Sequence, residues 1–368
     1  MDKQIMEIQV ATQKYEAWLG ERMPLIRADL ELKHRSMAES PFRFFRGTFY
    51  RWAQLFPRVC ARLMNAPQLL GVGDLHAENF GTWRDEEGRL IWGVNDFDEA
   101  CRLPYTADLV RLAASVHLAI EGDHLHLSRP RACKAILDGY VAALNAGGQP
   151  FVLAEHHMAL RQAAVERLKE PEKFWQKLYS FPHIKTEPPS SALKGLIKML
   201  PERNLKFRLS HRIAGTGSLG RRRYLALAQW RGGSIAREAK ELTGSAWKWA
   251  QSPRNVGKLF YGKILEQAVR VPDPFVRVRG RWIIRRLAPD CSRIELSSLP
   301  ERHDSVRLLH AMGWETANIH LGSANPAILL KDLNARPSHW LHSAAEAAVH
   351  WTLEDWRNWR SASAAPKK

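Results

Sequence analysis

Two carboxylates and one carboxamide are spaced so that they could bind a divalent cation at one end of a β-hairpin. Asp74 and Asn79 stand in a Gly-Asp-Leu-His-x-x-Asn segment, and Asp96 begins an Asp-Phe-Asp segment. Two apolar runs, 80–83 and 90–94, flank a polar turn that ends in glycine, and this pattern predicts two antiparallel strands. The hairpin would therefore bring all three polar side chains to the same end.

Oxygen ligands of this kind suit Mg²⁺, which is bound through one or two carboxylates and keeps positions open for phosphate oxygens. The alternative is a polar hairpin whose acids are simply solvated. We favour the cation site because three spacings agree at once: Asp74 to Asn79, Asn79 to Asp96, and the later Asp108.

The same residues resemble the catalytic segments of the aminoglycoside and choline kinase branch of the protein-kinase-like superfamily, and the whole chain resembles a bacterial kinase-like family of unknown function. The resemblance implies that Asp74 is the catalytic residue and that Asn79 and Asp96 hold the metal. A Pro-x-x-x-Asp-Leu segment after Asp96 is similar to one in the small-molecule kinases, which gives Asp108 a structural role in bracing the catalytic loop.

Four residues near these segments are candidates for supporting the site that Asp74, Asn79 and Asp96 would form. They are His76, Asp98 and Asp108, together with Arg46 in an aromatic Phe-x-Arg-Gly stretch. Arg46 could touch a phosphate or form a structural ion pair with a carboxylate, and both readings stay open. Val72 stands where the small-molecule kinases usually have His, and Asp98 replaces the Gly of the protein-kinase triplet. These departures leave the acceptor open and argue against a protein-serine kinase.

A second informative stretch is the glycine-rich segment with Gly215, Gly217, Ser218 and Gly220. A short apolar run follows it at 224–228, so we expect a loop between two strands that covers nucleotide phosphates with its backbone N–H groups. The alternative is a Rossmann fingerprint, which requires a helix directly after the loop. We rank it lower because three arginines and a second strand follow.

Lys240 lies about twenty residues beyond this loop, where the kinase pattern places the lysine that grips the phosphates. The alternative is a solvated lysine on a charged segment. Glu241 or Glu266 could be its ion-pair partner, but the sequence does not choose between them. We expect a helix over 255–269 between this strand and the next hairpin.

The parts occur in an unusual order, because the segment with Asp74 precedes the glycine-rich loop. We therefore expect an α+β, circularly permuted protein-kinase-like two-lobe fold, with a predominantly helical lobe and a small antiparallel-sheet lobe. Permutation is tolerable when the original termini lie close together. The expected division is a helical lobe with the catalytic hairpin at 1–190, a nucleotide-covering sheet lobe at 191–300, and returning helices at 301–368. A helix is expected over 151–178, and a helix at 304–321 should pack beside the hairpin.

The composition bounds the remaining possibilities. The formal net charge is +17, which favours anionic partners, although we expect most of the excess on a solvated face. Examples of this scattered charge are Arg221, Arg222, Arg223, Arg285 and Arg286. The four cysteines form no C-x-x-C pair and indicate buried thiols in a reducing cytosol. We find no signal peptide at the N-terminus and no apolar stretch of membrane-spanning length, so we expect a cytoplasmic protein.

These features together favour an ATP-dependent phosphotransferase that uses Mg²⁺ and transfers a phosphoryl group to an unidentified acceptor hydroxyl. The acceptor could be a small molecule and could be anionic. Two alternatives remain. One is a pseudokinase-type regulatory module that binds nucleotide without turnover. The other, motivated by charge alone, is a nucleic-acid-binding protein, and no sequence signature of such a protein supports it.

Overall fold

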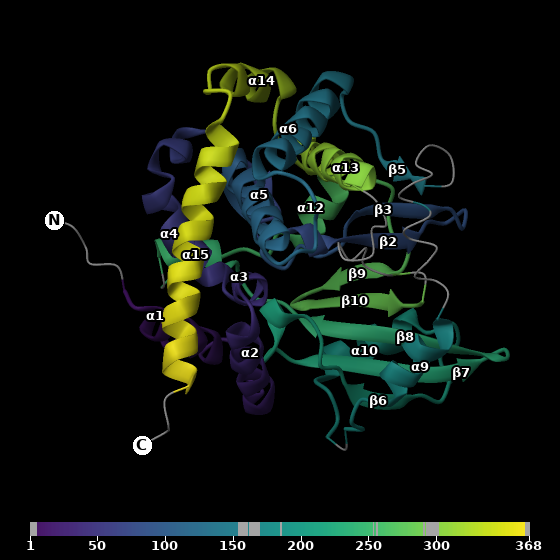
Figure 1. The fold of residues 1–368 in the computed structure, drawn as a ribbon. Coiled ribbons are helices and arrows are strands. Elements are labelled where there is room, and N and C mark those ends of the chain that lie inside the picture. The colour runs from purple at the N-terminus through teal and green to yellow at the C-terminus, as the bar shows by residue number, and fades with distance from the viewer. Residues whose placement is uncertain are drawn as a thin grey trace.

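The structure, a computed structural model, describes residues 6–364 except 154–160, 162–169, 185, 253, 255–256, 290 and 292–301. It is a mixed α and β protein with small antiparallel sheets, and this part of the expected fold is confirmed. Figure 1 shows a helical part above and to the left and a five-stranded sheet at the lower right.

The predicted hairpin is confirmed as β2 (Phe80–Arg84) and β3 (Leu90–Val94), which pair antiparallel with Phe80 opposite Val94. Asn79 therefore directly precedes one strand and Asp96 closely follows the other, at the same end. Two short strands lie next to this region in the chain, β1 (Gln68–Gly71) and β4 (Cys101–Pro104), and they pair with each other.

The expected helix over 151–178 is wrong at its start. Phe151 and Val152 instead form β5 (Phe151–Val152), which adds to the edge of the hairpin because Trp92 and Ile91 of β3 lie opposite. Residues 154–160 and 162–169 lie outside the described residues. A helix resumes at α9 (Pro171–Tyr179).

Four long helices form the body of the helical part. They are α5 (Tyr105–Glu121), α6 (Arg129–Ala146), α13 (Arg302–Leu321) and α15 (Trp340–Ala364). Helices α6 and α13 cross closely because each presents a glycine at the contact: a Cβ at Gly139 would clash with the backbone of His310, and one at Gly313 with the backbone of Ile136. A shorter helix, α14 (Pro326–Asn334), connects α13 to α15.

Helix α13 packs beside the hairpin, as expected for the helix at 304–321. The carboxylate of Glu315 accepts a hydrogen bond from the Val94 backbone nitrogen at 3.2 Å, across 221 residues of sequence. The same side chain fills the space that a Cβ at Gly93 would need. The C-terminal segment thus supports the strand that leads to Asp96.

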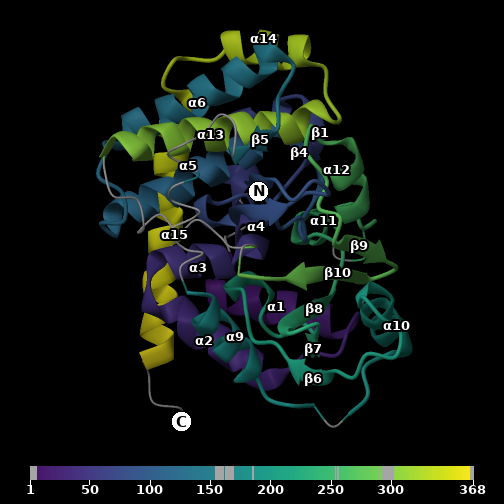
Figure 2. The ribbon, with the colours of Figure 1, turned by 90° about the vertical axis from the view of Figure 1, so that its right-hand side faces the viewer.

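The second sheet is built from five antiparallel strands in the spatial order β6-β7-β8-β10-β9. They are β6 (Arg208–His211), β7 (Arg223–Trp230), β8 (Gly233–Glu241), β9 (Val276–Arg279) and β10 (Trp282–Leu287). Alternate residues face opposite sides of a strand, and each side has its own helix. Helix α10 (Ser190–Met199) covers one face, where Ala226, Ala239 and Ile284 are buried. Helix α9 covers the other face, and its residue Leu178 packs there against Leu225 and Leu227 (Figure 2).

Helix α9 thus belongs with the sheet, although the expected boundary at residue 190 assigned it to the helical lobe. Its last turn is tied to β6 by the Arg208 guanidinium, which donates hydrogen bonds to the carbonyls of Tyr179 and Phe181 at 2.9 and 2.8 Å. The chain therefore enters the sheet lobe near residue 171.

The N-terminal helices bridge the two parts. They are α1 (Ile8–Gly20), α2 (Arg27–Glu39), α3 (Pro41–Gly47) and α4 (Phe49–Val59). The backbone nitrogen of Ile26 donates a 2.9 Å hydrogen bond to the carbonyl of Gly220, and Leu30 fills the space where a Cβ at Gly220 would lie. Two short helices after the sheet's third strand, α11 (Ala246–Gln251) and α12 (Tyr261–Gln267), complete the fold. The helix expected over 255–269 is limited to α12, and residues 255–256 lie outside the described residues.

Candidate functional site

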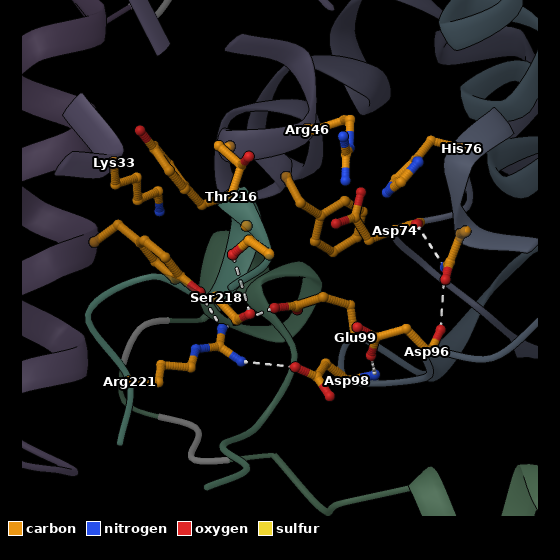
Figure 3. Close-up of a pocket in the computed structure, with 17 residues that line it drawn as sticks. Lys33, Arg46, Asp74, His76, Asp96, Asp98, Glu99, Thr216, Ser218 and Arg221 are labelled. Atoms are coloured by element: carbon orange, nitrogen blue, oxygen red, sulfur yellow. Dashed lines mark hydrogen bonds and ion pairs between the residues drawn. The ribbon is translucent and has the colours of Figure 1, made fainter. Parts of the chain in front are cut away.

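Most of the predicted site residues line one cavity, which we call the site pocket (Figure 3). Its free volume is about 50 Å³. Segments from the N-terminal helices, the hairpin end and the glycine-rich loop meet there. The predicted residues that line it are Arg46, Asp74, His76, Asn79, Asp96, Asp98, Gly215, Gly217 and Ser218. The other three predicted residues do not line it: Gly220 precedes the lining residue Arg221, Lys240 contacts Asp96, and Asp108 bonds to the backbone just before Asp74.

Asp108 braces the segment that carries Asp74, as predicted for it. It is fully buried in the first turn of α5, and its two oxygens accept hydrogen bonds from the backbone nitrogens of Val72 and Gly73 at 2.7 and 2.8 Å. His320 of α13 lies 3.0 Å from the same carboxylate. Gly73 has a φ of +81°, so the turn before Asp74 needs a residue that tolerates the left-handed region.

Asp74 is held by an arginine that the sequence did not single out. Arg111, one turn beyond Asp108 on α5, donates from Nε and Nη2 to Asp74 Oδ1 at 2.8 and 2.5 Å. Its guanidinium stacks over the rings of Phe45 and Phe49. Burial raises the pKa of Asp74 and Arg111 opposes that rise, with a net increase. Asp74 is therefore paired with one cationic neighbour, and its pKa lies above that of a solvated aspartate.

The two proposed metal ligands lie at the same end of the hairpin. The Asn79 amide nitrogen donates to the backbone carbonyls of Asp74 and Asp96 at 3.2 and 3.1 Å. These bonds fix the side chain so that Oδ1 is the atom that could bind a cation. The Asp96 carboxylate is the second oxygen donor, and a carboxamide with a carboxylate is a suitable partial set for Mg²⁺.

Lys240 is a buried ion-pair partner of Asp96 and Asp98, which excludes the solvated alternative. Its side chain is 2% exposed, Nζ lies 3.1 Å from Asp96 Oδ2, and it also contacts Asp98 Oδ2. Burial lowers the pKa of Lys240, and the two carboxylates oppose that shift. Burial also raises the pKa of Asp98, together with the charge of Asp96. Although burial would raise the pKa of Asp96 as well, Lys240 keeps it below its usual range.

Neither acid suggested as the partner of Lys240 has that role. Glu241 accepts hydrogen bonds from Arg222 at 2.6 and 2.8 Å, on the opposite side of β8 from Lys240. Glu266 is exposed on α12. Adjacent residues of a strand face opposite ways, and this is why Glu241 cannot accompany Lys240 toward the hairpin.

The glycine-rich loop lies over the segment with Asp74, between β6 and β7. A short 3₁₀ turn (Thr216–Ser218) forms its tip and a strand follows it, which excludes the Rossmann strand–loop–helix arrangement. A Cβ at Gly217 would lie 3.0 Å from the Arg46 carbonyl oxygen and 3.5 Å from Asp74 Oδ2. The loop is therefore closed onto Asp74, and the 50 Å³ beneath it admits water or an ion but not a triphosphate.

A larger cleft of about 820 Å³ lies on the other side of this loop and shares Gly215 with the site pocket. We call it the arginine cleft because arginines dominate its polar lining. They are Arg212, Arg223, Arg270, Arg277, Arg285 and Arg286. A volume of this size is in the range that binds nucleotide-sized ligands.

Glu238 of β8 gathers three of these arginines. It is completely buried and lies 2.5 Å from Arg212, 2.7 Å from Arg285 and 3.2 Å from Arg223. Burial would raise the pKa of Glu238, but the three guanidinium groups hold it well below its usual range. One carboxylate among three cations leaves an excess of positive charge beside Lys240.

The expectation that five arginines of the chain lie on a solvated face is therefore wrong. Arg221 and Arg223 are only 4% and 3% exposed, and Arg221 pairs with Glu99 at 3.0 Å. Arg222, Arg285 and Arg286 are partly buried. Each has a carboxylate or an aromatic ring as its neighbour, a relationship that a one-dimensional charge count does not reveal.

Arg46 and His76 occupy the rim. Arg46 pairs with the carboxylate of Glu78, so the structural reading of this arginine holds, although the residue still lines the site pocket. His76 accepts a hydrogen bond at Nδ1 from the Glu78 backbone nitrogen at 3.2 Å and caps the short turn that contains Asn79. Both residues thus help to set the shape of the hairpin end.

Lys33 is a pocket residue that sequence reasoning missed. It comes from α2, is 2% exposed, and lines the site pocket opposite His76 (Figure 3). Among the described residues its ammonium makes a cation–π contact with Tyr50 at 5.5 Å but has no ion pair. Burial lowers the pKa of Lys33 to about 8. The only signal in the sequence was a lysine inside an amphipathic helix, which is not distinctive.

Comparison with known proteins identifies a family to which part of the chain is similar. Residues 25–180 are similar to a family described as an uncharacterized protein conserved in bacteria (DUF2252). The matched region contains Asp74, Asn79, Asp96 and Asp108 but ends before the glycine-rich loop. No curated protein and no solved structure matches the chain. In the described part of the chain, no helix is both long and apolar enough to cross a membrane.

Proposed function

We propose that the protein is an ATP-dependent phosphotransferase with a circularly permuted kinase-like fold. The observation that carries the proposal is the meeting of three distant segments. The glycine-rich loop and the hairpin end line one pocket, and Lys240 contacts Asp96 across 144 residues of sequence. Phosphoryl transfer needs these groups together, because the metal bridges phosphates that the loop and the lysine must hold at the same time.

The order of strands in the five-stranded sheet supports the kinase-like reading. The glycine-rich loop joins its first and second strands in chain order, and Lys240 lies on the third. Protein kinases likewise carry their phosphate-binding lysine on the third strand, after the glycine-rich loop. The hairpin with Asp74 comes before this sheet instead of after it, and this order is the basis for proposing a permutation.

Asp74 has the contacts expected of a general base. Arg111 occupies Oδ1, so Oδ2, which lies beneath Gly217, is the atom available to an acceptor hydroxyl. The raised pKa of Asp74 makes it a better proton acceptor than a solvated aspartate. Asp108 and Gly73 keep its backbone in place, and accurate placement contributes much of the rate in such reactions.

Asn79 and Asp96 would hold Mg²⁺, whose chemistry is to neutralise charge on the transferred phosphoryl group. The donor set fits, since both residues offer hard oxygen atoms at the hairpin end. Lys240 already lies beside Asp96 and would hold a phosphate oxygen on the side of the sheet. The excess positive charge around Glu238 makes the neighbouring arginine cleft favourable for a polyphosphate.

The nucleotide would enter from the arginine cleft and direct its terminal phosphate past Gly215 into the site pocket. The closed loop must lift for this, because Gly217 lies directly over Asp74. Loops of this kind commonly open and close during turnover. Ile26 and Leu30 of the N-terminal region hold the end of the loop at Gly220, so movement would be concentrated at Thr216–Ser218.

One observation favours nucleotide binding without turnover as the second candidate. In the V-A-I-K pattern of protein kinases, a small alanine stands two residues before the lysine, on the same face of the strand. Here that position is Glu238, which is surrounded by three arginines. A site altered in this way could bind nucleotide in a different pose and serve regulation.

Measurement of ATP binding and ADP release tests the proposal. The purified protein is titrated with ATP in the presence and absence of Mg²⁺, and ADP release is then screened against hydroxyl- and amine-bearing metabolites. Mg²⁺-dependent ATP binding together with acceptor-stimulated ADP release supports the phosphotransferase. ATP binding without release for any acceptor supports the second candidate, and absence of nucleotide binding refutes both.

A further inference from the structure

A cluster of two histidines and one cysteine lies in the helical part, away from the site pocket. His117 on α5, Cys133 on α6 and His342 on α15 each offer one ligand atom, and these three atoms lie within 4.8 Å of one another. His117 Nε2 and Cys133 Sγ are 3.2 Å apart. Imidazole and thiolate on three separate helices are ligands that zinc prefers.

The separations are close to those that a tetrahedral zinc site requires. Zinc binds sulfur at about 2.3 Å and imidazole nitrogen at about 2.0–2.1 Å, so two ligand atoms stand roughly 3.3–3.6 Å apart. The 3.2 Å between His117 and Cys133 is slightly shorter, so the two side chains would have to move apart by a few tenths of an ångström to admit the ion. The rings of His117 and His342 have centroids 5.5 Å apart, and all three ligand atoms lie within 4.8 Å of one another, so the His342 nitrogen would have to move closer to complete the site.

Glu346 lies where an outer partner of a metal site would lie. Its Oε1 is 3.1 Å from His117 Nδ1, the nitrogen on the opposite side of the ring from Cys133. Arg129 holds the same carboxylate with contacts of 3.0 and 3.1 Å. Zinc-binding histidines commonly donate their second N–H to a carboxylate, which fixes the ring and its tautomer.

Two further observations favour an ion over a simple buried contact. Nδ1 of His342 is buried yet has no hydrogen-bond partner among the described residues, and an unsatisfied buried polar atom needs an explanation such as an ion. His342 and Glu346 have side chains 30% and 38% exposed, which gives an ion a route from solvent.

We propose that His117, Cys133 and His342 bind one zinc ion that links α5, α6 and α15, with Glu346 orienting His117. The fourth position would be taken by water. Binding releases the Cys133 thiol proton to solvent, because the thiolate is the ligand. The ion would fasten the C-terminal helix to the helices that support Asp74, and so would stabilise the fold without acting in the reaction.

The test is zinc stoichiometry and cobalt substitution on the full-length protein. We expect about one zinc per chain after desalting. With Co²⁺ we expect a thiolate-to-cobalt absorption band. Both should be lost in Cys133→Ser and His342→Asn. Both should persist in the matched controls Cys60→Ser, a buried cysteine elsewhere, and His350→Asn, an exposed histidine further along α15.

Thermal unfolding gives a second readout that does not depend on the cysteine variant folding well. Zinc should raise the Tm of the wild-type protein and of both controls, because an ion that binds the folded state alone stabilises it. It should leave the Tm of His342→Asn unchanged. If wild-type protein binds no stoichiometric zinc and shows no cobalt–thiolate band, the cluster is a buried His–Cys hydrogen bond and the proposal is wrong.

Discussion

Arg111 donates two hydrogen bonds to a single oxygen of Asp74, at 2.8 and 2.5 Å, while its guanidinium lies completely buried against aromatic rings. The other oxygen of Asp74 stays beneath Gly217. Oδ1 of Asp74 is therefore occupied by Arg111, whereas Oδ2 accepts no hydrogen bond from Arg111 and faces the site pocket. A buried charge pair of this kind is costly to break, because the remaining charge has no partner.

Removal of the arginine should therefore destabilise the fold. We expect Arg111→Met to lower the free energy of unfolding, as measured by urea denaturation, by up to about 3–5 kcal/mol, because Asp74 is left partly buried and unpaired. The same substitution in an Asp74→Asn background should cost less, since the uncompensated charge is gone. Equal losses in both backgrounds would mean that aromatic packing, and not the ion pair, gives Arg111 its role.

Asp74→Asn should separate binding from transfer. The carboxamide cannot act as a base, so we expect acceptor-dependent ADP release to slow by roughly 10²–10⁴ while ATP affinity stays nearly unchanged. Arg111 then lacks its counter-charge, so rates must be compared at a temperature where both proteins are folded by circular dichroism. Equal loss of ATP affinity and turnover would identify Asp74 as a structural or metal-binding residue.

Asp96→Asn should remove the effect of Mg²⁺ on nucleotide binding. The substitution deletes a carboxylate at the hairpin end and touches little of the core, while Asp98 remains beside Lys240. Calorimetric titration with ATP should show a large Mg²⁺ dependence in wild type and almost none in the variant. Glu86→Gln, at the exposed turn of the same hairpin, serves as the control and should behave like wild type. A variant that keeps wild-type turnover would refute the metal assignment.

Lys33→Met should weaken binding of an anionic acceptor. The Lys33 ammonium lines the site pocket but not the arginine cleft, and its pKa of about 8 keeps it charged at pH 7. A hydrogen bond to a charged group contributes about 1.5–3 kcal/mol, so we expect the acceptor KM to rise roughly 10- to 100-fold with ATP affinity preserved. Lys14→Met, an exposed lysine on α1, is the control. A change confined to ATP affinity would reassign Lys33 to the nucleotide.

The part of the site that the sequence predicted is the part encoded locally. Asn79 and Asp96 border a hairpin whose turn and apolar alternation can be read directly, so their meeting follows from strand pairing. Lys240 was found through its distance from the glycine-rich loop. The mixed α and β class with antiparallel sheets was also predictable, because the apolar periodicity changes between segments.

What the sequence could not show depends on contacts between distant segments. Arg111 and Lys33 lie on helices where a basic residue is unremarkable, and only the packing of α5 and α2 turns them toward Asp74 and the site pocket. Glu238 stands in a charged segment of the sequence, yet it is buried in a strand because three arginines from separate elements surround it. Burial of a charge cannot be deduced until its partners are known.

Glu315 should make the stability of the protein depend on pH. Burial raises its pKa to about 7, despite the nearby charge of Arg270. A carboxyl with a higher pKa in the folded state holds its proton there while the unfolded chain has lost it, so stability falls as pH rises from about 4.5 to 7. The shift in pKa lowers the free energy of unfolding by roughly 3 kcal/mol at most.

Glu315→Gln should lack this decline, which urea unfolding at pH 4.5 and pH 8 would measure. Glu354→Gln, an exposed residue on α15, should decline like wild type. If Glu315→Gln declines equally, Glu315 is ionised in the folded protein, and its support of the hairpin through Val94 is that of a charged acceptor.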